Sequence, residues 1–163
     1  MSEEEFRRGM RRVAGTVTVV TTRGPNGERR GATATAVCSL TVDPPSVMAC
    51  INRQTWVGRL APESGNFAVN VLSADDVAIA ETFAGRTKVE PEARFQSGNW
   101  RAGDTGAPIL DDALSVFDCQ LEKAIDFASH VILIGRVVRT WIGPDEGPPL
   151  VYVEGGYTST RQG

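Results

Sequence analysis

Residues 31–52 carry the clearest chemical pattern, because small apolar and hydroxyl side chains alternate along their first ten positions, as on a β-strand. One face is expected to be small and apolar and to pack inward: Ala32, Ala34, Ala36, Cys38 and Leu40. The other face is expected to form a shallow, mostly hydroxyl row: Thr33, Thr35, Val37 and Ser39. A flat polar molecule can lie close to the backbone of such a row, since no bulky side chain stands in the way.

A turn suited to an anion is expected just beyond this run. Pro44-Pro45 forces a bend, and a second buried strand over 47–51 leads to Asn52. The segment Asn52-Arg53-Gln54-Thr55 then lies where a helix is expected to begin, and helix N-termini attract anions. Arg53 and Thr55 add hydrogen-bond donors, although Thr55 also fits a simple N-cap.

His130 is the single histidine of the chain and stands at the start of an apolar strand. A zinc site with several histidines is therefore excluded, and no metal site is expected. Ser129 beside His130 does not predict a catalytic triad, because neighbours on a strand face opposite ways. The glycine motifs of dinucleotide-binding folds, P-loops and nucleophile elbows are missing from the sequence.

Composition indicates one globular domain over 1–163, with 41% hydrophobic and 23% charged residues. A net charge of −3 gives nucleic-acid binding little support, and on a helix Arg7 and Arg8 have Glu3 and Glu4 as i,i+4 partners. The cysteines Cys38, Cys50 and Cys119 lack CxxC spacing and are expected to be buried thiols in a reduced compartment. With neither a signal peptide nor an apolar run of about 20 residues, a cytoplasmic location without a membrane contact is expected.

These residues must be positioned by many short strands. Ser2 and Glu5 have capping-box spacing for a first helix, Thr55 begins a second, and Ser73 is expected to cap a third that ends at Gly85. Residues 86–108 are rich in glycine and proline and are expected to form a functional loop or lid. A Gly/Pro-rich turn is expected over 143–149. Further strands are expected over 16–22, from residue 30 onward, and over 67–72, 114–121, 131–141 and 150–153. This pattern predicts a mainly β fold, a closed or split β-barrel with two or three short flanking helices.

In order and spacing, five motifs between Phe6 and Tyr157 resemble the flavin reductase-like family, short-chain reductases that supply reduced flavin to oxygenases. They are the 31–52 run, Asn66 to Ser73, Phe83-Ala84-Gly85-Arg86, His130 with the apolar strand after it, and Pro149 to Tyr157. The resemblance implies an FMN-binding split β-barrel of Greek-key-like topology. It also implies a homodimer whose flavin sites lie near the subunit boundary.

The resemblance also implies a set of flavin-binding residues. Those expected at the ring are Thr33, Thr35, Ala36, Val37 and Cys38, and Ser39 is expected at the ring or the ribityl chain. Asn52 is expected near the ribityl chain and phosphate, and Arg53 and Thr55 near the phosphate. The motif that contains Phe83 and Gly85 places Arg86 near the phosphate, although surface solvation also explains this arginine.

The nicotinamide side is implied by His130 and Tyr157. Family members present the histidine of a Gly-Asp-His triplet to the nicotinamide, and the triplet here reads Ala128-Ser129-His130. Tyr157 occupies the C-terminal aromatic position, where it flanks the nicotinamide or simply packs. The loss of the glycine and the aspartate leaves the strength of nicotinamide binding open.

The implied activity is hydride transfer from NADH or NADPH to FMN, with FAD as the other flavin. The reduced flavin would then serve a separate monooxygenase. Two other functions stay open on the same barrel. One is a non-catalytic flavin- or haem-binding protein, and the other is a flavin-dependent oxidase of the pyridoxamine phosphate type.

Overall fold

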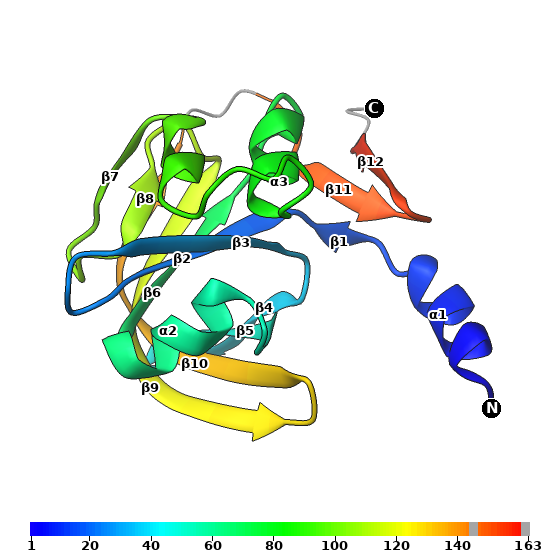
Figure 1. Ribbon diagram of the computed structural model, residues 1–163, viewed down its shortest axis with the longest axis horizontal. Helices are drawn as coiled ribbons and strands as arrows, with labels where there is room; N and C mark the ends of the chain where they lie inside the picture. Colours follow the sequence, from blue (N-terminus) through cyan, green and yellow to red (C-terminus); the bar gives the residue numbers. More distant parts are fainter. Residues whose placement is uncertain (144–146, 161–163) are drawn as a thin grey trace.

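The computed structural model describes residues 1–143 and 147–160, so the expected turn over 143–149 lies partly outside the described residues. The predicted mainly β, split-barrel fold with short flanking helices is confirmed (Figure 1). The helices are α1 (Glu3–Arg11), α2 (Trp56–Ser64), α3 (Val77–Phe83) and the 3-10 helix η1 (Ala93–Gln96). The strands are β1 (Gly15–Thr16), β2 (Thr18–Arg23), β3 (Arg29–Ala34), β4 (Val37–Val42), β5 (Pro45–Asn52), β6 (Asn66–Val71), β7 (Trp100–Ala102), β8 (Pro108–Leu110), β9 (Ser115–Phe127), β10 (His130–Ile142), β11 (Leu150–Val153) and β12 (Gly156–Ser159).

The main sheet has seven antiparallel strands in the order β3-β2-β6-β9-β10-β5-β4. Its two edge strands, β3 and β4, are consecutive in the chain and are joined by a bend at Thr35 and Ala36. At this bend the backbone N–H of Cys50 donates to the carbonyl of Ala36 at 2.8 Å. The sheet thus curls around α2 without closing, and we call the gap between β3 and β4 the seam (Figure 1).

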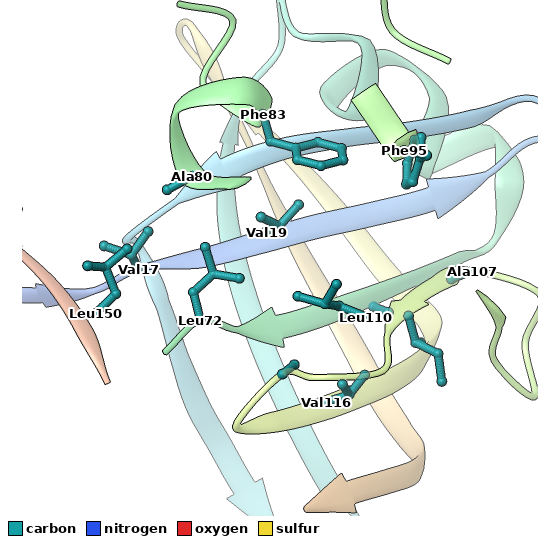
Figure 2. Close-up of a cluster of buried hydrophobic side chains, with 13 residues drawn as sticks. Val17, Val19, Leu72, Ala80, Phe83, Phe95, Ala107, Leu110, Val116 and Leu150 are labelled. Carbon is teal, nitrogen blue, oxygen red and sulfur yellow. The ribbon is translucent and has the colours of Figure 1, made fainter. Parts of the chain in front are cut away.

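Each face of the sheet has its own core. On the inner face, Val57 and Ala61 of α2 pack against Phe67, Leu133 and other buried residues. On the other face, α3, η1 and β8 cover the sheet, with Phe83 and Leu110 among the cluster of Figure 2. The central strands β2 and β6 contribute buried side chains to both cores.

The expected alternation over 31–40 stops at the bend. Ala32 and Ala34 pack inward, but beyond the bend it is Val37 that packs against the inner core. The bend shifts the facing of the strand by one residue, so the prediction of an inward apolar face is wrong for Ala36, Cys38 and Leu40. Leu40 is 48% exposed, and Cys38 is an exposed thiol instead of a buried one.

Residues 86–108, which were expected to form a functional loop or lid, pack against the body. Phe95 of η1 is buried, and the segment ends in the β7–β8 hairpin. The backbone N–H of Thr105 donates to Oδ2 of Asp118, a buried carboxylate on β9, at 2.9 Å. This bond ties the hairpin to the main sheet.

Local hydrogen bonding sets where α3 starts. Ser2 and Glu5 form the expected capping box, whereas Ser73 does not cap a helix as expected. Its N–H and hydroxyl both donate to the Asp76 carboxylate at 2.8 Å, and the helix begins only at Val77.

Among residues 1–143 and 147–160, no helix is long and apolar enough to cross a bilayer.

Candidate functional site

A small hollow of about 200 Å³ opens between the end of β3, the end of α3 and the β11–β12 hairpin. It brings together four residues predicted for the site, Thr33, Thr35, Arg86 and Tyr157, which are far apart in the sequence. The remaining lining residues are Val17, Ala34, Ala84 and Tyr152. We call this the Arg86 hollow.

Arg86 is held in place at the hollow. Its Nη1 donates to Oε1 of Glu81 at 2.9 Å. Hydrogen bonding to Tyr152 and the charge of Glu81 raise the pKa of Arg86. Burial, followed by the charge of Glu81, raises the pKa of Tyr157, whose ring centre lies 5.3 Å from that of Tyr152. The hollow therefore presents the Arg86 guanidinium, held by Glu81, beside two tyrosine rings.

The two threonines of the hollow have different tasks. The Thr33 hydroxyl donates to the carbonyl of Ala80 at 2.6 Å and so ties β3 to α3. Thr35 is exposed at the bend, and a Cβ on Gly15 would come within 2.8 Å of the Thr35 Cβ. Glycine at position 15 thus allows β1 to lie against the bend, and Thr35 also lines the hollow.

Phe83 and Gly85 support the hollow from behind. Phe83 is 2% exposed and packs edge-on against Phe95 and at a tilt against Trp100, with ring centres 5.1 and 5.2 Å apart. Gly85 has φ +77°, a left-handed conformation that ends α3 and turns the chain into Arg86. The structure thus places Phe83 in the core, away from any ligand surface.

The predicted ring residues on β4 border the seam. Val37, Cys38 and Ser39 pair with Ala49, Met48 and Val47 of β5, and the other side of β4 has no partner strand in the main sheet of the described residues. Ala36 lies at the bend and lines a shallow groove with Thr35 and residues of α1. The backbone of β4 is therefore open along its outer edge.

A second group of predicted residues lies at the end of β5 and the tip of the β9–β10 hairpin. Asn52 and His130 are directly opposed in the sheet, and the next residues form the bond from Arg53 N–H to the Ser129 carbonyl at 2.9 Å. Asn52 and His130 are thus a non-hydrogen-bonded pair, whose Cα atoms lie about 4.5 Å apart and whose side chains share a face.

Local bonds occupy two of the polar groups expected at the phosphate. The Thr55 hydroxyl accepts from the N–H of Gly58 at 3.0 Å and donates to the carbonyl of Asn52 at 2.7 Å, so it caps α2. The Arg53 side chain lies 3.7 Å from the Asp126 carboxylate and donates to the carbonyl of Ala128 at 3.4 Å. The structure therefore places Arg53 as a tether of the hairpin tip.

The hairpin tip corrects the expectation for Ser129. Ala128 has φ +47° in the two-residue turn between β9 and β10. The turn brings the Ser129 hydroxyl within 2.9 Å of Nδ1 of His130. Neighbours on a strand face apart, but Ser129 belongs to the turn, so its side chain reaches the imidazole.

Comparison with known proteins decides the family. The model of the "Flavin reductase like domain" matches residues 10–161. The chain belongs to the flavin reductase family. It is 41% identical over 138 residues to "FMN reductase (NADH) RutF" of Ancylobacter novellus, which covers 85% of this chain and 75% of that protein. It is 36% identical over 155 residues to the reductase component of an FADH(2)-dependent resorcinol hydroxylase of Rhizobium sp., which covers 94% and 85%.

Its fold is similar to that of BorF, the flavin reductase component of a bacterial two-component tryptophan halogenase. The TM-score is 0.88 at 30% identity, and the match covers 99% of each chain. This chain and that reductase component thus share their overall fold.

The residues at the seam fit the flavin that the family name implies. The hollow offers the Thr35 hydroxyl, two phenols and a fixed guanidinium, and the unpaired β4 edge adds backbone donors and acceptors. Such donors suit a flat polar ring that carries an anionic tail. Tyr152 was missed by the sequence analysis, because its place depends on how β11 pairs with β1 across the chain.

The predicted residues nevertheless lie in separate groups. Figure 1 shows the β9–β10 tip, which carries His130, well away from β12 and α3 at the Arg86 hollow. Among the described residues, no group of three or more His, Cys, Asp and Glu side chains is placed to hold a metal ion.

Proposed function

We propose that this protein is an NADH:flavin oxidoreductase that releases its reduced flavin to a separate flavin-dependent enzyme. The fixed Arg86 cation beside the open backbone of the seam is the observation that carries this proposal. The names of its relatives support it, since they include an FMN reductase that uses NADH and reductase components of a hydroxylase and a halogenase. FMN is the proposed flavin and FAD the alternative, and NADPH is the alternative nicotinamide.

Bound flavin supplies the hydride acceptor, and the chain supplies binding and alignment. Thr35, Ala36 and the β4 residues Val37 to Ser39 hold the ring edge through backbone and hydroxyl groups. Arg86 binds the phosphate, and Tyr157 with its neighbour Tyr152 closes the side of the hollow. His130 binds the nicotinamide. Alignment of two reactants can be worth about 7–11 kcal/mol of barrier without any general base.

A homodimer is part of the proposal, because among the described residues the side of β4, β5 and the β9–β10 hairpin that carries His130 is apolar and has no element covering it. Residues that are opposed in the sheet share a face. The half-buried or exposed apolar side chains on the side of His130 form what we call the outer face: Cys38, Met48, Cys50, Ile125, Phe127, Ile132 and Ile134. Phe127, directly opposite His130, is 76% exposed. We propose that a second copy covers this face and brings its own His130 group toward the seam.

The dimer is tested by sedimentation of the full chain and of Ile132→Glu. The charge should convert a dimer into a monomer, since a carboxylate would be buried without a partner. A wild-type chain that sediments as a monomer at micromolar concentration contradicts this part of the proposal.

A cytoplasmic location is proposed because all three cysteines are free thiols.

The activity is tested by adding each flavin and each nicotinamide and following the nicotinamide absorbance. NADH should be consumed with FMN, and His130→Ala should raise the KM for NADH about tenfold while flavin affinity stays unchanged. Flavin binding without any NADH or NADPH consumption would favour a non-catalytic flavin protein. Peroxide formation from pyridoxamine phosphate without nicotinamide would instead select an oxidase.

A further inference from the structure

We propose that Ser129 is a positioning residue for His130, which it orients through a hydrogen bond to Nδ1. The inference rests on the proposed function, because it concerns the nicotinamide side of that site. The two atoms lie 2.9 Å apart at the tip of the β9–β10 hairpin. With Nδ1 engaged, Nε2 is the ring nitrogen left to meet a ligand.

The backbone of Ser129 is fixed independently of its side chain. The Ser129 carbonyl accepts from the N–H of Arg53 at 2.9 Å, and the Ala128 carbonyl accepts from the Arg53 guanidinium at 3.4 Å. Through the two successive carbonyls of Ala128 and Ser129, these bonds anchor the turn to Arg53, the residue that follows β5. The hydroxyl therefore approaches the imidazole from a defined place.

The chemistry of the pair explains why a hydroxyl is useful here. An imidazole has one ring nitrogen that donates and one that accepts when it is neutral, and a partner at one nitrogen sets the role of the other. A serine hydroxyl can donate or accept, so His130 can offer Nε2 as an acceptor or as a donor. The nicotinamide carboxamide carries both an N–H₂ donor and a carbonyl acceptor, and either form of His130 can bind it.

The other polar groups near His130 already have partners of their own. Asn52 is the neighbour of His130 on β5, and its Oδ1 already accepts from the N–H of Gln54 at 2.9 Å. Asp126 and Arg53 lie 3.7 Å from each other, so these charges at the tip are paired. Ser129 is thus the polar side chain that the structure bonds directly to the His130 ring.

The test compares steady-state kinetics of Ser129→Ala and Ser129→Thr with those of the wild-type chain. Loss of the hydroxyl should raise the KM for NADH about three- to tenfold with kcat and flavin affinity unchanged. Ser129→Thr keeps a hydroxyl and should restore most of the KM. Ser64→Ala is a matched control, because it removes a hydroxyl bonded to the carbonyl of Leu60 on α2, and should change none of these values.

A double-mutant cycle separates positioning from a merely structural role. In a His130→Ala background, Ser129→Ala should have no further effect on the KM, since there is no ring left to orient. An unchanged KM in Ser129→Ala, or an equal loss with and without His130, overturns the proposal. A wild-type chain that oxidises no nicotinamide would instead refute the proposed function itself.

Discussion

Arg86 and Glu81 form an ion pair at the rim of the Arg86 hollow, with Nη1 and Oε1 2.9 Å apart. Glu81 lies on α3 and Arg86 just beyond its end, so the helix fixes the direction of the guanidinium. A cation held in this way loses little freedom when an anion binds.

Arg86→Gln should therefore weaken the binding of FMN, about tenfold, and leave riboflavin binding nearly unchanged. Riboflavin lacks the phosphate, so it is the matched ligand, and Arg86→Lys should retain part of the difference. Quenching of flavin fluorescence measures both affinities. Equal losses for FMN and riboflavin would show that Arg86 does not bind the phosphate.

Ala128→Gly should stabilise the protein. Ala128 has φ +47°, where a side chain costs about 1–2 kcal/mol, and glycine removes this cost. Glycine is also freer than alanine in the unfolded state, which offsets part of this gain. The free energy of unfolding, measured with urea, should therefore rise by about 0.5–1 kcal/mol. Ala124→Gly on extended β9 is the control and should destabilise; a gain there as large as at 128 would contradict the explanation.

Gly58→Ala should destabilise the protein and disturb the end of β5. An added Cβ would lie 3.0 Å from the Cα of Arg53 and closer still to the Asn52 carbonyl oxygen, and both are backbone atoms that cannot rotate away. The expected cost is about 1–3 kcal/mol in thermal unfolding. Gly9→Ala in α1 meets nothing within 4 Å and should not destabilise, so a similar loss at both positions would rule out the steric explanation.

The stability of the protein should fall in alkaline solution because of Cys119. Burial, with the nearby Asp118 charge as a smaller cause, raises the pKa of the Cys119 thiol to about 12. An unfolded thiol titrates near 8.5, so the folded state binds its proton more tightly, and stability present below about pH 8.5 is lost as the pH rises toward 12.

From pH 8 to pH 10 this group should lower the free energy of unfolding by about 2 kcal/mol. Urea unfolding under reducing conditions measures the slope. Cys119→Ala should be less stable at pH 8 but should show a flatter slope, with a remainder from Tyr157, whose pKa is also raised. An unchanged slope in the variant would assign the effect to other groups.

The parts of the fold predicted well are those encoded by neighbours in the chain. The Ser2–Glu5 capping box and the Thr55 cap are read from spacing alone, and both are confirmed. The bend at Thr35 and Ala36 had no such signal, because neither residue breaks a strand. The change of facing at this bend turned Val37 inward and exposed Cys38. It depends on how β4 pairs with β5, a contact that the local pattern does not contain.

The candidate site shows the same division. Resemblance selected Thr33, Thr35, Arg86 and Tyr157, which the fold gathers into one hollow. Tyr152 also lines that hollow, and Glu81 pairs with Arg86 at its rim. These residues come from the β11–β12 hairpin and from α3, elements that sequence spacing does not relate to each other.

The open edge at β4 has a consequence for handling the protein. Soluble proteins guard such edges with charged side chains, but β4 reads Val-Cys-Ser-Leu-Thr-Val and carries no charge. The proposed flavin site covers this edge, so adding FMN to the buffer should slow the precipitation that pairing between exposed β4 strands would cause during concentration.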